Sequence, residues 1–127
     1  MKLALDKAQK FFYSACMKSA IILIGLVAST SVFARDPIIT SMEYAAKINS
    51  VDPKIVKAIC WVESRLQPKA VNPDDGGSPS YGLCQVKLAT AQWMDKVYKL
   101  KHKATVKRLM DPTINAFYAA KLLSAIS

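Results

Sequence analysis

The stretch from Asp52 to Leu66 constrains the fold most, because it has the pattern of an amphipathic helix with a carboxylate beside its apolar face. Asp52 is a favourable N-cap and Pro53 suits the first helical position, so the sequence predicts a helix that starts here. At about 100° per residue, one apolar stripe is expected to contain Ile55, Ile59, Val62 and Leu66.

Glu63 falls on the flank of this stripe, between Val56 and Ile59. An ionised carboxylate in apolar surroundings is costly unless it is paired, so such a group tends to stay protonated, as a general acid must. The structural alternative is a glutamate at the rim of the stripe that extends into water. Helical position alone leaves both interpretations open.

The N-terminal part of the chain has the pattern of a secretory signal. Its apolar block, Ala20 to Ala28, is too short for the roughly 20 residues that span a bilayer. Lysines precede the block, and Val32-Phe33-Ala34 suits cleavage after Ala34. We therefore expect residues 1–34 to be a signal peptide, with translation starting at Met1 or Met17 and an uncleaved anchor as the alternative.

Residues 35–127 are expected to form one small domain that acts in the periplasm or outside the cell. This part carries 14 Lys and Arg against 8 Asp and Glu, a formal net charge of +6. Cys16 would leave with the signal, whereas Cys60 and Cys84 would reach an oxidising compartment and favour one disulfide. Two cysteines and His102 are too few for a zinc site, and no metal or cofactor is expected.

The rest of the chain predicts a mainly α fold of the α+β kind, with a short irregular or β insert. Pro37-Ile38-Ile39 is expected to be extended, with Thr40 or Ser41 capping a short helix. Apolar contacts of that helix are expected from Met42, Ala45, Ala46 and Ile48.

Turn-forming residues concentrate between Gln67 and Ser80, which indicates a loop or a short hairpin. Ser80 to Val86 can be a tight turn or a strand. Lys87 to Leu100 again has a helical pattern, with Ala91, Met94, Val97 and Tyr98 on one side. Asp111-Pro112 is expected to start the last helix.

A basic tract extends from Lys96 to Arg108. A solvated helix face and linker is the favoured interpretation, and a patch for a polyanion is the alternative. Tyr98 is the one aromatic residue within the tract, which lacks the repeated aromatic interleaving and the recognition motifs of nucleic-acid binders, so nucleic acid is not an expected partner.

Three separated pieces carry a family resemblance: Cys60-Trp61-Val62-Glu63-Ser64-Arg65, Tyr81-Gly82-Leu83-Cys84-Gln85-Val86, and Asp111 to Asn115 ahead of Tyr118 to Leu123. In this order the pieces resemble the soluble lytic transglycosylase family, whose catalytic domain has the goose-type lysozyme fold. The resemblance covers about Ile39 to Leu123. It implies cleavage of peptidoglycan between N-acetylmuramic acid and N-acetylglucosamine, with formation of a 1,6-anhydro ring.

The resemblance also implies roles for individual residues. Glu63 would be the sole catalytic acid and base, with Ser64 lining the site beside it. Tyr81, Gly82 and Gln85 would form the groove wall, with the Gln85 amide available to the sugar. Asn115 and Tyr118 would be polar residues at the start of the last helix. Besides Glu63, four of these residues have a purely structural alternative: a helix end for Ser64, a packing aromatic for Tyr81, a turn glycine for Gly82 and an extended cap for Asn115.

A single catalytic carboxylate agrees with the residues themselves. Hydrolytic glycosidases usually need two, and capping or surface roles are plausible for Glu43, Asp52, Asp95 and Asp111. Asp74 and Asp75 are the best remaining candidates for a second one. The sequence also predicts a disulfide bond between Cys60 and Cys84. Cys60 lies about one helical turn before Glu63, and Cys84 lies in the turn that should face the same helix.

The chain departs from the family pattern in two places. Cys84 stands where the family usually has Met, and the sequence ends at Ser127, where the family usually continues into a Tyr-Asn-x-Gly motif. The first expectation is a monomeric enzyme that acts on glycan strands, with a secretion, conjugation or phage apparatus as its expected context. The alternative is a non-catalytic or truncated peptidoglycan-binding module.

Overall fold

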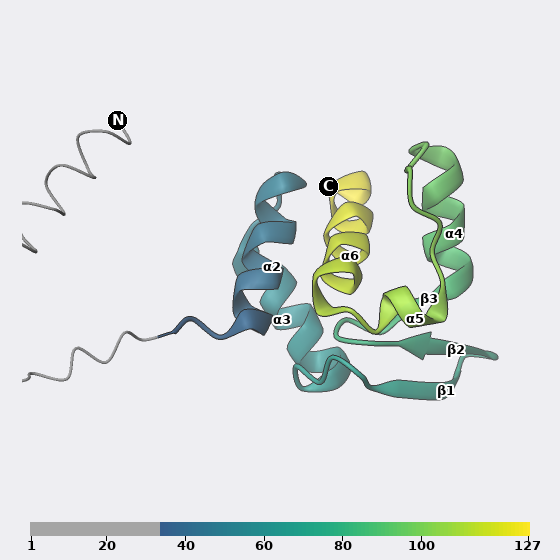
Figure 1. The fold of residues 1–127 in the computed structure, drawn as a ribbon, viewed down its shortest axis with the longest axis horizontal. Coiled ribbons are helices and arrows are strands. Elements are labelled where there is room, and N and C mark those ends of the chain that lie inside the picture. Colours follow the sequence, from purple (N-terminus) through teal and green to yellow (C-terminus); the bar gives the residue numbers. More distant parts are fainter. Residues whose placement is uncertain (1–33) are drawn as a thin grey trace, which may run out of the picture. The chain divides into compact units, whose positions relative to one another are not determined.

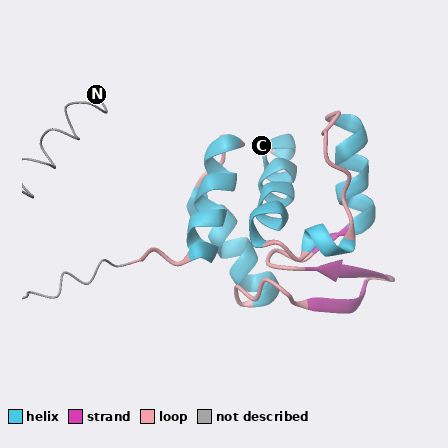
Figure 2. Ribbon diagram, viewed as in Figure 1, coloured by secondary structure: helices cyan, strands magenta, loops and turns pink. Residues whose placement is uncertain are grey.

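A computed structural model describes residues 34–127, so the predicted signal peptide lies outside the described residues. The described part is a mainly helical α+β domain (Figures 1 and 2). Its elements in chain order are α2 (Pro37–Ile48), α3 (Pro53–Ser64), β1 (Val71–Asp75), β2 (Ser78–Tyr81), β3 (Val86–Lys87), α4 (Leu88–Val97), α5 (Val106–Leu109) and α6 (Pro112–Ile126). This confirms the fold class that the sequence predicts.

Three of the helices begin with the same Asp-Pro pair. The carboxylates of Asp36, Asp52 and Asp111 each accept a hydrogen bond from a backbone N–H of the first helical turn, and a proline follows each of them. The aspartate satisfies a backbone donor that has no partner inside the helix, and the proline lacks the donor that would otherwise be unpaired. The predicted starts of α3 and α6 are therefore confirmed.

The predicted start of α2 is wrong. Pro37–Ile39 form the first helical turn rather than an extended segment, and Thr40 and Ser41 lie inside the helix. The physical reason is the cap at Asp36, whose Oδ1 accepts from the Ile38 backbone N–H at 2.9 Å. Ser41 instead donates its hydroxyl to the Pro37 carbonyl and shares a hydrogen bond with Thr113 of α6.

The last helix organises the core. In Figure 1, α6 lies between α2 and α4, with the small sheet at one end of these helices. Ala116 and Ala120 of α6 belong to a buried cluster that also contains Met42, Ala46, Val56, Cys60 and Leu83. Tyr118 belongs to a second cluster, with Val86, Ala91, Met94, Ala104 and Leu109. Both halves of the domain therefore pack on one helix.

The predicted apolar stripe of α3 is not the buried face. Val56 and Cys60 are fully buried, whereas Ile55 is 52% and Val62 is 76% exposed. The disulfide and packing contacts of Cys60 determine which side of this helix faces the core. The spacing of apolar residues along the helix does not determine it. Ile48 of α2 and Val97 of α4, also expected in the core, are about half exposed.

The turn-rich segment forms a hairpin, one of the two alternatives that the sequence left open. Strand order is β1-β2-β3 with antiparallel pairing, and Val71 faces Tyr81 while Tyr81 also faces Val86. Gly76 and Gly77 join β1 to β2 with φ of 64° and 91°, a backbone conformation that glycine adopts without steric cost. Within residues 34–127 no helix is long and apolar enough to cross a bilayer.

Candidate active site

An open groove of about 350 Å³ lies between α3, the small sheet, the start of α4 and α6. It brings together parts of all three sequence pieces that carry the family resemblance. The lining residues are Ile59, Glu63, Asp75, Cys84, Gln85, Val86, Lys87, Thr90, Met94, Tyr118, Ala119 and Leu122.

Glu63 lies in the last turn of α3, next to the helix end at Ser64. Its side chain is exposed and lines the groove. Helical position left burial and exposure of this carboxylate open, and in the structure Glu63 occupies the exposed rim position. The chain then turns sharply, because Arg65 and Leu66 both have positive φ, of 57° and 61°. Glu63 therefore stands at the edge of a helix end where the carboxylate can reach a molecule in the groove.

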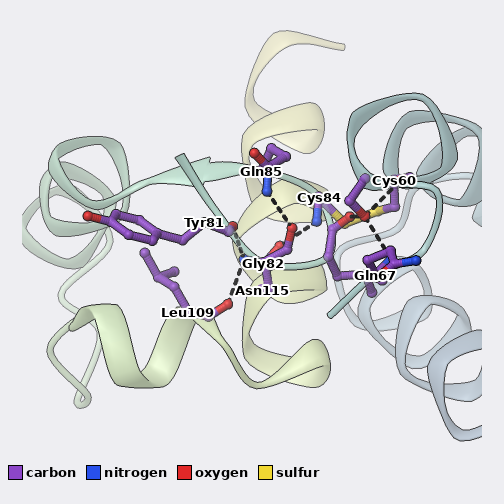
Figure 3. The surroundings of a disulfide bond; sticks show 10 residues. Cys60, Gln67, Tyr81, Gly82, Cys84, Gln85, Leu109 and Asn115 are labelled. Atoms are coloured by element: carbon purple, nitrogen blue, oxygen red, sulfur yellow. Dashed lines mark hydrogen bonds between the residues drawn. A yellow bond between two sulfur atoms is a disulfide. The ribbon is translucent and has the colours of Figure 1, made fainter. Parts of the chain in front are cut away.

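The turn from Gly82 to Gln85 forms the groove wall and is fixed to α3 by two contacts. The predicted disulfide between Cys60 and Cys84 is present (Figure 3). Ser64 donates its hydroxyl to the Leu83 carbonyl at 2.5 Å and accepts from the Gln67 N–H at 3.0 Å. Ser64 does not line the groove, and its hydroxyl joins the helix end to the wall.

Asn115 fixes the same turn from the opposite side, from the first part of α6. Its Oδ1 accepts from the Cys84 N–H at 2.7 Å, and its Nδ2 donates to the carbonyls of Tyr81 at 2.7 Å and Leu109 at 2.8 Å. The side chain is completely buried, so its amide is used inside the protein (Figure 3). This geometry is that of a structural residue beneath the groove rather than one on its surface.

Gly82 of the wall lies against Leu109 of α5 and Asn115 of α6. Its φ is 78°, and a Cβ atom here would overlap the Leu109 carbonyl oxygen and the Asn115 amide. Its N–H donates to the Ala70 carbonyl at 2.7 Å. Only glycine satisfies both the positive φ and the close approach. Tyr81, the residue before it, is half-buried against the second core cluster and does not line the groove.

Gln85 lines the groove, but internal hydrogen bonds engage most of its amide. Its Nε2 donates to the carbonyls of Ala70 at 3.1 Å and Gly82 at 2.9 Å, and its Oε1 accepts from Ser80 at 2.8 Å. Both amide hydrogens are thus occupied, and one acceptor position on Oε1 is left for a ligand. The backbone φ of Gln85 is 51°, an uncommon value for a residue with a side chain. The amide network supports this conformation.

Tyr118 forms part of the groove floor and is 3% exposed. Its hydroxyl donates to Asp95 Oδ1 at 2.6 Å. Burial raises the pKa of Tyr118 well above its ordinary value, and the hydrogen bond and negative charge of Asp95 raise it further, while Arg108 acts in the opposite direction. The phenol is therefore held neutral and directed away from the groove, toward Asp95.

The groove contains a second carboxylate, Asp75, one of the two candidates named from the sequence. The Lys87 ammonium donates a hydrogen bond to the backbone carbonyl of Asp75, and its Nζ lies 4.0 Å from Asp75 Oδ2. Asp74 instead accepts from the Gly77 N–H in the hairpin turn and does not line the groove. Asp75 is thus paired with a cation next to the groove.

Lys87 is the residue that sequence reasoning missed. It directly follows Val86, where the quoted motif ends, and its strand β3 pairs with β2. Gln85 lies in the turn before β3, with φ of 51°, so the side-chain alternation of a strand does not extend from Gln85 to Lys87, and no local pattern placed Lys87 at the groove. Among the residues that the structure describes, no three His, Cys, Asp or Glu side chains cluster as a metal site requires.

Comparison with known proteins supports the relationship suggested by the three sequence pieces. No curated protein matches the chain significantly. A family model described as the transglycosylase SLT domain matches residues 40–126, which include α3, the sheet, the groove wall and α6. Members of this family have a lysozyme-like α+β fold and act on peptidoglycan, generally outside the cytoplasm. The chain therefore belongs to the transglycosylase SLT domain family.

Proposed function

We propose that this protein is a lytic transglycosylase that cleaves the β-1,4 bond between N-acetylmuramic acid and N-acetylglucosamine in peptidoglycan. The observation that carries the proposal is the position of Glu63 on an open groove whose opposite wall is the Gly82–Gln85 turn. The family match over residues 40–126 supplies the substrate class.

In the proposed reaction Glu63 performs both proton transfers. Its carboxylic acid first protonates the glycosidic oxygen, and the bond from that oxygen to C1 of the muramic acid breaks. The 6-hydroxyl oxygen of the same sugar then bonds to C1, and its proton returns to Glu63. No water is consumed, so the product ends in a 1,6-anhydro ring and the catalyst is restored.

The pairing of Asp75 supports a one-carboxylate mechanism over hydrolysis. Retaining and inverting glycosidases use a second carboxylate as nucleophile or base. Here the Asp75 carboxylate forms an ion pair with Lys87, and this pairing favours a structural role for Asp75 at the end of the hairpin. We assign Asp75 and Lys87 to shaping the groove and Glu63 to the chemistry.

The other predicted site residues are proposed to act on the groove wall. Ser64, Gly82 and Asn115 position the turn through the contacts described above. Gln85 and Tyr118 line the groove, and we propose that they contact the sugar through the free acceptor of Oε1 and the face of the phenol ring. Tyr81 supports the turn through its backbone carbonyl.

We further propose that residues 1–34 export the protein and that it works as a monomer in the periplasm or outside the cell. The apolar block and the Val-Phe-Ala sequence support export, and the Cys60–Cys84 disulfide suits an oxidising compartment. We also propose that the protein opens peptidoglycan for a secretion, conjugation or phage apparatus. N-terminal sequencing of the exported protein should give Arg35 first, and an intact N-terminus would contradict the export proposal.

The test uses exported protein, purified murein and mass spectrometry of the released fragments. The native protein should release fragments that end in anhydromuramic acid, each lighter by one water than a hydrolysed fragment. Glu63→Gln keeps the shape of the side chain but cannot exchange the proton, so it should lower the rate by about 10⁴-fold or more. Its binding to murein should be nearly unchanged.

Asp75→Asn is the matched control, because it also replaces a groove carboxylate by its amide. It should retain most of the cleavage rate. Near-normal cleavage by Glu63→Gln, or release of hydrated reducing ends alone, would contradict the proposed mechanism. Murein binding without cleavage by the native protein would identify a glycan-binding module instead.

A further inference from the structure

A second cavity, of about 270 Å³, opens on another part of the domain. It lies between α2, α6 and the chain that follows α4, and none of Glu63, Gln85 and Lys87 lines it. Tyr118 is the one residue that contacts both this cavity and the groove, and its hydroxyl is bound to Asp95. The cavity is therefore a feature that the proposed catalytic reaction does not use.

The floor and one side of the cavity are apolar. Tyr44 and Ile48 come from α2, and Ile114 and Phe117 come from α6. Tyr44 is 55% and Ile48 is 49% exposed, because the core side of α2 is occupied by Met42, Ala45 and Ala46. Exposed apolar side chains around a hollow are typical of a surface that buries an apolar group from another molecule.

The rim of the same cavity carries two cations, Lys101 and Arg108, with His102 beside them. The Arg108 Nε is buried and has no hydrogen-bond partner. A buried donor left unpaired is unfavourable, and more so when the group is charged. An acceptor from a bound molecule would remove this cost.

In the described part of the chain, no ion pair includes a side chain of this rim. Among residues 34–127 the ion pairs involve Glu43 and Asp75, and neither pairs with Lys101, His102 or Arg108. Asp95, the acidic residue bound to the cavity's Tyr118, already accepts from the Tyr118 hydroxyl and from the Ala104 N–H. The rim thus keeps a positive charge beside an apolar floor.

We propose that this cavity is a docking site for an acidic segment of a partner protein that carries a bulky apolar or aromatic side chain. The side chain fills the hollow between α2 and α6, and flanking carboxylates of the segment pair with Arg108 and the lysine of the rim. Large aromatic anchors in pockets with a charged rim are the usual centres of such interfaces. Peptidoglycan stem peptides carry carboxylates but mostly methyl-sized apolar groups, which would leave the floor uncovered.

The binding test is independent of catalysis. The probe is an acetylated and amidated heptapeptide, Gly-Asp-Glu-Trp-Glu-Asp-Gly, titrated into the exported protein by calorimetry. One control peptide replaces Trp by Ala, and another replaces the four acidic residues by Asn and Gln. We expect each control to bind about tenfold more weakly or worse, the difference that 1.4 kcal/mol of binding free energy produces.

Three variants test whether the probe peptide binds in this cavity. Ile48→Glu puts a carboxylate at the apolar edge, where it competes for the cations and repels the probe, and should weaken binding at least about tenfold. Arg108→Gln should weaken it similarly. Ile55→Glu is the matched control, because Ile55 is 52% exposed and lies outside the cavity. It should leave binding unchanged.

Three results would overturn the inference. The first is an absence of probe binding at millimolar concentration. The second is equal binding by Ile48→Glu and the native protein, with circular dichroism showing both to be folded. The third is a disaccharide-tetrapeptide from murein that shifts the amide resonances of Ile48 and His102 at lower concentration than the probe does.

Discussion

Replacement of Asn115 by alanine should destabilise the domain strongly, although the residue lies beneath the groove. Its amide satisfies three main-chain groups: the Cys84 N–H and the carbonyls of Tyr81 and Leu109. The side chain is fully buried, so water has no direct access to these groups in the native fold. Alanine would remove all three hydrogen bonds at once.

The expected loss follows from the number of groups left without a partner. Each buried, unpaired group costs about 1 to 3 kcal/mol. Three such groups therefore cost about 3 kcal/mol or more, against which the better helix propensity of alanine returns at most about 0.7 kcal/mol. Domains of this size are stable by about 5 to 15 kcal/mol in total. The variant should consequently be close to the limit of stability.

Thermal unfolding followed by circular dichroism measures the effect. A loss of 1 kcal/mol lowers the melting temperature of a domain this small by about 4 to 8 °C, so Asn115→Ala should lower it by about 10 °C or more. Cleavage of murein should also fall at temperatures where the variant is still folded, because the Gly82–Gln85 wall loses its support from α6.

Asn49→Ala is the control, since Asn49 also donates from its amide to a backbone carbonyl, that of Ala45, at 2.9 Å. Asn49 is half-buried and makes this bond at the end of α2, so its replacement should cost about 1 kcal/mol. A melting temperature for Asn115→Ala within a few degrees of that for Asn49→Ala would refute the reasoning.

Three further changes test the same architecture. Replacing both Cys60 and Cys84 by serine should lower the free energy of unfolding by about 3 kcal/mol in urea titrations, because the bond closes a loop with a sequence separation of 24; reduction that leaves the native protein equally stable would contradict this. Tyr118→Phe removes the hydrogen bond to Asp95 and should cost about 1.5 to 3 kcal/mol at neutral pH. Since folding raises the pKa of Tyr118, its contribution is complete below pH 10 and is lost as the pH rises further; the native protein should therefore lose more stability above pH 10 than Tyr118→Phe does, and parallel pH profiles would argue against it. Gly82→Ala should prevent stable folding at 37 °C, as judged by soluble yield and circular dichroism, because its Cβ would overlap the Leu109 carbonyl; a well-folded variant would show that the wall can move away from α6.

Local sequence determined the helix starts at Pro53 and Pro112 and the hairpin between Gln67 and Tyr81. An Asp-Pro pair satisfies the first turn of a helix by itself, and a run of Pro, Gly, Asn and Asp excludes a helix whatever surrounds it. The pairing of two cysteines in one small domain was likewise predictable, because there was one possible partner for each in residues 35–127. The helix starts and the hairpin depend on neighbours in the chain, and the cysteine pairing depends on the number of cysteines.

The tertiary structure alone decided which side of each helix is buried and what the polar site residues do. Periodicity along α3 selected Ile55 and Val62, but Cys60 is tied to Cys84 and Ser64 is bonded to Leu83, so the helix is rotated to bury Val56 and Cys60. Asn115 supports a turn more than 30 residues away in the chain, a contact that no local pattern encodes. The spacing of apolar residues indicates that a helix has an apolar side. The segments that pack against the helix determine which of its apolar residues are buried.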